Sequence, residues 1–128
     1  MPHPVDSRDP SDWFRKGQDD LQRVPRRLQE GDYEDAAFHL QQALEKCLKG
    51  FLIARGWKLQ RTHNRSLLLD EATPFLSALE SHQSLCQEVS AFYVEERYPL
   101  SMEPPTREEL EPLLQQAQQL INLLRVAK

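Results

Sequence analysis

The chain has 128 residues, of which 39% are hydrophobic and 28% charged. This length suits one compact domain, and the balance excludes a mostly disordered chain. The formal net charge of −4 also excludes nucleic-acid binding driven by overall charge alone.

The N-terminal sequence carries neither the signature of a signal peptide nor that of a transmembrane helix. It lacks a basic start followed by an apolar stretch, and no apolar run in the chain approaches the roughly 20 residues that span a bilayer. We therefore expect a soluble, cytoplasmic protein with no membrane partner.

Residues 1–10 contain three prolines and few apolar side chains, which predicts a flexible tail before a helical domain at residues 11–128. Ser11 is the expected N-cap of a first helix that Gly31 ends. Pro25 falls inside this helix and is expected to bend or break it. The expected apolar stripe consists of Phe14, Gly17, Leu21, Val24 and Leu28.

A long second helix is expected between Asp32, a good N-cap, and Gly56, which supplies the stop. Its wide apolar face favours a central position, in contact with more than one neighbouring helix. The stripe runs through Tyr33, Ala36, Ala37, Leu40, Ala43, Leu44, Cys47, Leu48, Phe51 and Leu52.

The third helix is expected to begin at Thr62 or Asn64 and to be broken at Thr73–Pro74, with Thr73 capping the new segment. Core positions in this region are Leu67, Leu68, Leu69, Ala72, Phe75, Leu76 and Leu79.

Residues 81–84 are typical of a turn before a fourth helix, which ends ahead of Pro99 and a proline-rich loop. The last helix opens with Thr106 and Glu109, a capping box. Inward positions of these two helices are Leu85, Val89, Phe92, Tyr93, Leu110, Leu113, Leu114, Ala117, Leu120, Ile121 and Leu124.

No segment alternates with the two-residue period of a strand. The sequence therefore predicts an all-α fold: an up-and-down four-helix bundle with one broken helix and short extra helical segments.

The sulfur and imidazole groups give no support for a metal or cofactor site. Cys47 and Cys86 lie on apolar stripes and are expected to be buried free thiols. His39, His63 and His82 are scattered, and no pair has the spacing of zinc ligands. We expect neither a metal nor a cofactor.

Positive charge gathers in the middle of the chain. There is no acidic residue between Glu45 and Asp70. The same stretch contains six basic residues: Lys46, Lys49, Arg55, Lys58, Arg61 and Arg65. This stretch could form an anion-binding surface, or its bases could complement the carbonyl end of a helix, and the two interpretations are compatible.

Several charged and aromatic side chains have interpretations that involve no ligand. Lys46 and Lys49 are expected on the exposed side of the second helix, where Lys49 can pair with Glu45. Trp13 and Trp57 are expected as anchors at the edge of the core. Arg23, Arg26 and Arg27 are expected to form a solvated face around Pro25.

Three stretches together resemble one known family, the HEPN domain. They are Phe38–Leu52, with a histidine, a Gln-Ala pair and Glu-Lys on one helix; Arg61–Leu69, with Thr-His before a leucine-rich helix; and Arg97-Tyr98-Pro99. The resemblance covers about residues 13–127.

The resemblance implies a homodimer that binds a nucleotide or RNA, often beside a separately encoded minimal nucleotidyltransferase in a toxin–antitoxin-like module. On this basis the candidate ligand-binding residues are His39, Lys46, Lys49, Arg61, His63 and Arg97. No catalytic residue is assigned.

Some HEPN relatives are metal-independent ribonucleases with an arginine, four to six residues and then a histidine. Arg97 is followed by no such histidine, Arg61 is too close to His63, and Arg55 is too far from it. A non-catalytic accessory protein is therefore our main hypothesis. The alternatives are a ribonuclease that uses Arg61 and His63, and a helical interaction module without a ligand.

Overall fold

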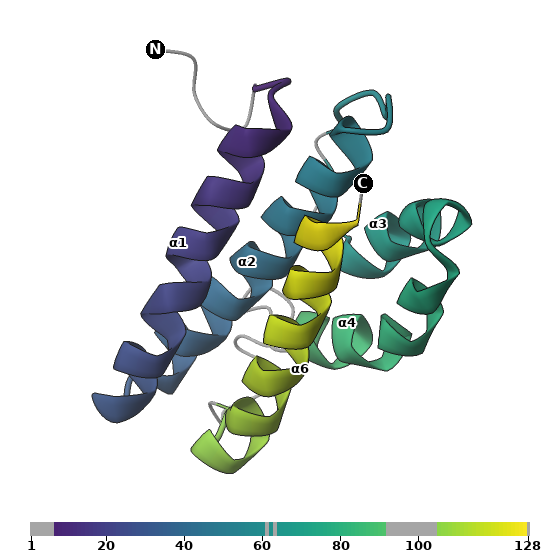
Figure 1. Cartoon of the computed structure of the whole chain (residues 1–128). Coiled ribbons are helices and arrows are strands. Elements are labelled where there is room, and N and C mark those ends of the chain that lie inside the picture. The colour runs from purple at the N-terminus through teal and green to yellow at the C-terminus, as the bar shows by residue number, and fades with distance from the viewer. Residues whose placement is uncertain (1–6, 61, 63, 92–104, 128) are drawn as a thin grey trace.

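The computed structural model describes residues 7–60, 62, 64–91 and 105–127, and within these ranges every regular element is a helix. Two long helices, α1 (Pro10–Gln29) and α2 (Tyr33–Ile53), pack antiparallel. A broken third layer follows, made of α3 (Arg65–Ala72), the 3₁₀ segments η2 (Thr73–Phe75) and η3 (Ser77–His82), and α4 (Gln83–Ser90). The final helix, α6 (Arg107–Val126), runs parallel to α2 (Figure 1). The all-α up-and-down bundle with a broken helix is confirmed.

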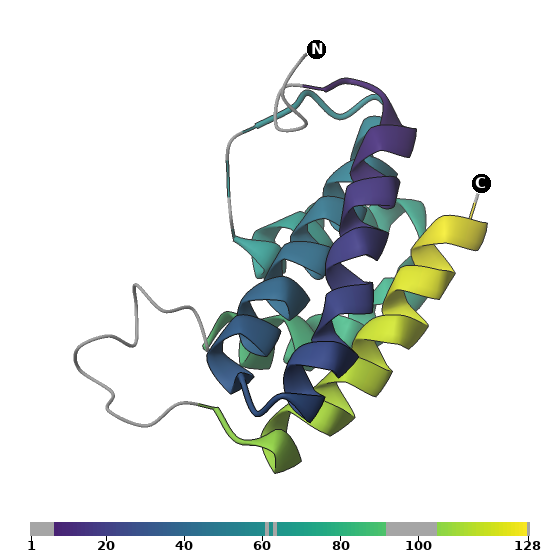
Figure 2. The ribbon, with the colours of Figure 1, turned by 90° about the vertical axis from the view of Figure 1, so that its left-hand side faces the viewer.

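Helix α2 is the centre of the molecule. It contacts α1 on one side, α6 on another and the α3–α4 layer on a third, and Figure 2 shows the layers around it. Thirteen of its 21 residues are buried, which agrees with the wide apolar face expected from the sequence. Polar side chains on this helix are therefore forced to find partners inside the bundle.

The start of α1 differs from the expectation. Asp9 rather than Ser11 is the N-cap, because its side chain accepts a hydrogen bond from the Ser11 N–H and Pro10 occupies the first turn. Ser7 packs against this turn, with its carbonyl accepting from the Trp13 indole N–H at 2.9 Å. Trp13 is only 3% exposed but lies outside the continuous apolar cluster of the core, so the anchor expected at the core's edge is itself buried.

Pro25 does not break α1, which is continuous through it to Gln29. The connection to α2 is made by Gly31, whose φ of 76° is in the left-handed region that glycine adopts without strain. Asp32 then caps α2 as expected, accepting from the Asp35 N–H.

The broken layer is confirmed, with two corrections. Thr73 is not an N-cap; its hydroxyl instead donates to the carbonyls of Leu69 and Asp70, at the end of α3. Residues 81–84 are not a turn, because η3 runs directly into α4. Asn64 is the cap of α3. Phe92, Tyr93, Pro99 and the loop to residue 104 lie outside the described residues.

The core is one continuous apolar cluster with two free, fully buried thiols, as expected for Cys47 and Cys86. The Thr106–Glu109 capping box is present at the start of α6. No helix within the described ranges is long and apolar enough to cross a membrane.

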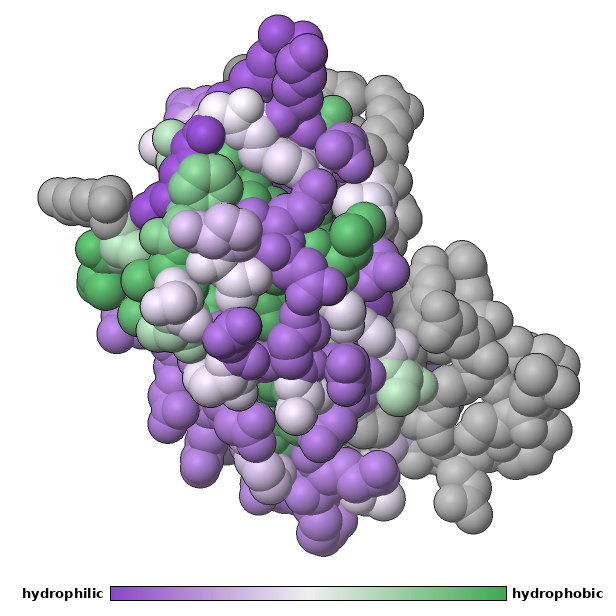
Figure 3. Space-filling view, turned by 90° about the vertical axis from the view of Figure 1, so that its right-hand side faces the viewer, coloured by the Kyte–Doolittle hydropathy of each residue, from purple (hydrophilic) through white to green (hydrophobic). Residues whose placement is uncertain are grey.

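Most of the surface on the α3–α4 side is hydrophilic, but apolar surface gathers beside the C-terminal end of α6 (Figure 3). Val126, at this end, is 63% exposed.

Candidate functional site

Two groups of charged side chains lie between helices, and both are built on α2. The first joins α2 to α1, and we call it the α1–α2 seam: Asp20, Asp35, His39 and Lys46. The second joins α2 to α3, and we call it the α2–α3 ion cluster: Glu45, Lys49 and Arg65. Together they contain three of the six candidate residues named from the sequence.

Asp20 is the centre of the α1–α2 seam. It is 4% exposed, and its two oxygens are hydrogen-bonded by different residues of α2. His39 Nδ1 lies 2.8 Å from Asp20 Oδ1, and Lys46 Nζ donates to Asp20 Oδ2 at 2.6 Å. Because a buried carboxylate requires such partners, these contacts fix the pairing of the two helices as well as the charge.

The second ring nitrogen of His39 also faces a carboxylate. Its Nε2 lies 3.3 Å from Asp35 Oδ2, one turn earlier on α2. The imidazole thus bridges Asp20 and Asp35, and its side chain is 15% exposed. A histidine held in this way positions neighbouring groups and has no free ring nitrogen to transfer protons to a ligand.

Lys46 keeps a partly exposed side chain, at 25%, above the seam. It is the candidate residue from α2 that remains open to solvent while being held in place. Its charge is partly offset by Asp20, so the seam is not a bare positive surface.

Lys49 corrects the sequence analysis. The sequence predicts it on the exposed side of α2, but it is 1% exposed, with Nζ 3.3 Å from Glu45 Oε2 and 5.5 Å from the centroid of a Trp13 ring. Residues three positions apart differ by about 60° around a helix at 100° per residue, so Lys46 can lie at the edge of the buried face while Lys49 lies within it. The expected Glu45–Lys49 pair is confirmed, although in a buried setting.

Arg65 completes the α2–α3 ion cluster. It is 4% exposed, its Nη1 lies 3.4 Å from Glu45 Oε1, and its Nε donates to the Ser90 hydroxyl of α4 at 3.1 Å. One arginine at the first residue of α3 therefore ties together three helices. Gln41 adds a further tie, donating to the Val89 carbonyl at 2.8 Å.

Within the described residues, most cations of the acid-free stretch therefore do not form the open positive surface that its charge suggests, although Lys58 is exposed. Lys46, Lys49 and Arg65 are each paired with a buried carboxylate. Arg55 lies against its own helix, with its guanidinium 3.6 Å from the Phe51 ring centroid and a hydrogen bond to the Phe51 carbonyl. This second contact agrees with the alternative that some bases complement a helix end.

Arg61, His63 and Arg97 lie outside the described residues. Arg61 and His63 are four and two positions before Arg65 in the sequence.

Sequence reasoning missed Asp20, and it missed the burial of Glu45. Asp20 and Glu45 stand among apolar positions of their helices, three or four residues from Gly17, Val24 and Leu48. A charged residue on an apolar stripe is a signal of a buried partner, because burying it alone would be costly.

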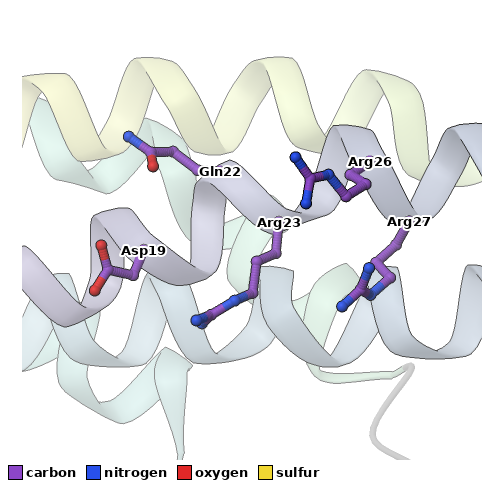
Figure 4. Close-up of a pocket in the computed structure, with 5 residues that line it drawn as sticks. All are labelled: Asp19, Gln22, Arg23, Arg26 and Arg27. Carbon is purple, nitrogen blue, oxygen red and sulfur yellow. The ribbon is translucent and has the colours of Figure 1, made fainter.

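A shallow pocket of about 240 Å³ lies on the outer face of α1, beside the seam. It is lined by Asp19, Gln22, Arg23, Arg26 and Arg27, as Figure 4 shows. The sequence predicts that the three arginines are merely solvated. Arg27 is instead held by Asp35 and Glu30, and these two carboxylates raise its pKa.

Burial raises the pKa of both cysteine thiols to about 12. At neutral pH they are protonated and unreactive, so neither serves as a nucleophile. Among the described residues the arrangement holds charged groups in fixed positions, and it provides no nucleophile–base pair.

The fold, the α1–α2 seam and the α2–α3 ion cluster together define a small helical-bundle domain. Its central helix carries buried ionic contacts. The chain belongs to the HEPN domain family, which matches residues 10–127.

Two solved structures are similar to it. TT1696 from Thermus thermophilus shares 27% identity with a TM-score of 0.80, over 93% of this chain and 98% of that one. ST0689, an archaeal HEPN homologue, shares the fold at 24% identity with a TM-score of 0.72, over 91% and 95% of the two chains. No curated protein matches this chain.

Proposed function

We propose that this chain is a non-catalytic HEPN protein that binds a nucleotide or nucleic acid and acts with a separately encoded minimal nucleotidyltransferase, in a toxin–antitoxin-like or related pair. The observation that carries the proposal is membership of the HEPN family without the arginine–histidine spacing of its ribonucleases. The family supplies the ligand class, and the missing spacing argues against cleavage.

The surroundings of the described histidines support the non-catalytic half. RNA cleavage without a metal needs an imidazole that is free to move a proton and a cation beside the phosphate. His39 has carboxylates at both ring nitrogens, and the pKa of His82 is lowered by burial in the α3–α4 layer. Neither follows an arginine at the required spacing in the sequence.

The ligand surface that we propose is centred on Lys46 and on the chain segment before α3. Lys46 is held and partly exposed, and Arg61 and His63 precede the buried Arg65 by four and two positions in the sequence. We propose Arg61, His63 and Arg97 as direct contacts, with His39 and Lys49 supporting the surface from below.

Self-association as a homodimer is part of the proposal. Apolar surface beside the C-terminal end of α6, including the 63% exposed Val126, supports it, since exposed apolar patches often mark contact surfaces. Sedimentation equilibrium should show a dimer, and a monomer at every concentration would contradict this part.

Calorimetric titration with ATP and with a short single-stranded RNA tests the binding half, with and without the partner nucleotidyltransferase. We expect binding of at least one of the two ligands. If neither binds in either arrangement, the proposed function is wrong.

An RNA-cleavage assay in chelator tests the non-catalytic half. We expect no cleavage. Cleavage that disappears in His63→Ala would instead identify the chain as a ribonuclease using Arg61 and His63.

A further inference from the structure

The outer face of α1 gathers positive charge beside the seam. The pocket beside the seam is lined by three guanidinium groups and one carboxylate, that of Asp19. Arg26 and Arg27 follow Arg23 by three and four residues, which is about one turn further along the same helix.

Arg23 is available to bind a ligand although it lies near Asp20. Its Nη1 is 3.6 Å from Asp20 Oδ1, which is beyond hydrogen-bonding distance. The two oxygens of Asp20 are already bonded by His39 and Lys46. Arg23 is therefore held near Asp20 by a longer ion pair, and its N–H donors make no hydrogen bond within the described part of the chain.

Arg27 is the fixed member of the group. Its Nε donates to Asp35 at 2.6 Å and its Nη1 to Glu30 at 2.9 Å. A guanidinium has five N–H donors, so the Nη2 group keeps two of them for a ligand. The two carboxylates hold the side chain in place before a ligand arrives, which lowers the entropic cost of binding.

Arg26 is the adaptable member. It makes no hydrogen bond or ion pair within the described part of the chain. Figure 4 shows Arg23 and Arg27 directed toward α2 while Arg26 extends to the opposite side of α1. Because Arg26 has no bond to lose, it can turn to an anion over the helix at the cost of side-chain entropy alone.

We infer that this face, which we call the α1 arginine face (Arg23, Arg26 and Arg27), binds a phosphate group of the nucleotide or nucleic-acid ligand. Guanidinium groups pair with phosphate through parallel N–H···O bonds, and phosphate offers enough oxygens for several of them. The Gln22 amide, which also lines the pocket, adds a neutral donor. This inference rests on the proposed function and names where its ligand is held.

The position of the face is consistent with one continuous ligand surface. Arg23 and Lys46 both lie at Asp20, one from each helix, so the α1 arginine face adjoins the proposed Lys46 contact. A phosphate at the arginines would place the rest of a nucleotide over the α1–α2 seam or along α1.

The test compares ATP, adenosine and a short RNA in titrations against the full chain and single variants. The informative variants are Arg26→Gln and Arg23→Gln. Arg26→Gln removes a charge that has no hydrogen-bond or ion-pair partner among the described residues, and Arg23→Gln removes only the 3.6 Å ion pair with Asp20, whose oxygens keep the hydrogen bonds from His39 and Lys46. The matched control is Arg15→Gln, which removes the same charge from an exposed residue of α1. It lies eight residues before Arg23, or about 12 Å along the helix at 1.5 Å per residue.

We expect ATP or RNA to bind about tenfold more weakly to each informative variant, as for the loss of one charge-assisted hydrogen bond. Arg15→Gln should change binding by less than about twofold, because charges separated by a Debye length are largely screened. Arg26→Lys should keep part of the affinity, and adenosine should bind poorly to every form. Thermal melts of each variant verify that it is folded.

The outcomes separate the inference from the proposed function. If ATP or RNA binds and Arg26→Gln behaves like Arg15→Gln, the α1 arginine face is wrong and the proposed function stands. If adenosine binds as well as ATP, phosphate recognition is wrong. If neither ATP nor RNA binds the unmodified chain, with or without the nucleotidyltransferase, both fail. Loss with ATP alone or with RNA alone identifies which source supplies the phosphate.

Discussion

The α2–α3 ion cluster gives the most direct test of the structural reasoning. Glu45 lies between two cations that are themselves inaccessible, Lys49 at 1% and Arg65 at 4% exposure. Glu45→Gln keeps the shape of the side chain but removes the negative charge. Breaking a buried ion pair from one side costs about 3–5 kcal/mol, because the remaining charge is left in a medium that solvates it poorly.

This cost is large for a chain of 128 residues. The free energy of unfolding of a small domain is about 5–15 kcal/mol, so the substitution should remove a substantial part of it. We expect the urea midpoint to fall accordingly, and the melting temperature to drop by about 10–20 °C.

The control is Glu111→Gln on α6. Glu111 pairs with Arg107 at 2.6 Å, a shorter contact than either bond of Glu45 to its two cations, but both partners are about half exposed. An exposed pair is worth at most about 1 kcal/mol. Equal losses in the two variants, or a loss below about 1 kcal/mol for Glu45→Gln, would refute the argument that burial gives this cluster its importance.

Three further predictions concern the packing, the thiols and a helix cap. Gly17→Ala should destabilise the fold by about 1–2 kcal/mol, although alanine has the better helix propensity, because the added Cβ would lie 2.5 Å from Cys47 Sγ. Urea unfolding measures this loss, and Cys47→Ala in the same chain should recover most of it. Since burial raises the pKa of Cys47 and Cys86 to about 12 from 9.0, the unfolded chain ionises first, so their stabilising contribution is complete below pH 9.0 and falls by about 1.4 kcal/mol per pH unit per thiol as the pH rises toward 12. The double alanine variant should lose that part of the alkaline dependence, and an unchanged profile would contradict the burial of the thiols. Asn64→Ala should cost about 1 kcal/mol in urea unfolding by removing the cap of α3, whereas Thr62→Ala should cost less, and the reverse order would be inconsistent with the cap assignment.

Most helix positions and most of the core can be predicted from the sequence because apolar periodicity indicates burial. Leu67 and Phe75 are exceptions, since both are expected in the core but are 42% and 52% exposed. Local spacing identifies Asp32 and the Thr106 capping box, since the cap and its backbone partner lie within one turn. It leaves the cap of α3 open between Thr62 and Asn64, and the structure selects Asn64. The predicted cap of α1 is two residues too late because Asp9 and Ser11 are both good caps. The position of Pro10 decides between the two caps, because proline is favoured in the first turn of a helix, and this places the cap at Asp9.

The candidate site is predicted less well, for a physical reason. Charge counted along the sequence does not reveal which carboxylate lies across a helix interface. Lys46 is paired with Asp20, 26 residues earlier, and Arg65 with Glu45, 20 residues earlier. These contacts depend on the rotation of α2 about its axis, and a difference of one residue turns a side chain by about 100°.

The arginines of α1 show the opposite error. Arg23, Arg26 and Arg27 are predicted to be solvated because they face away from the apolar stripe. Their grouping beside the seam depends on Asp35 and Glu30 holding Arg27, a pairing across the turn between two helices. Short-range spacing on α1 alone contains no information about that turn.

The contact between Trp13 and Lys49 gives the molecule an internal optical probe. The chain has two tryptophans. Trp13 is buried, with the Lys49 ammonium group over its ring, whereas Trp57 is half-buried and donates its indole N–H to Glu71. Emission from Trp13 should shift to longer wavelength whenever the adjoining ends of α1 and α2 separate, and a Trp57→Phe variant would isolate that signal. Loosening of the bundle on contact with a nucleotide or an enzyme could then be followed in real time without any attached dye.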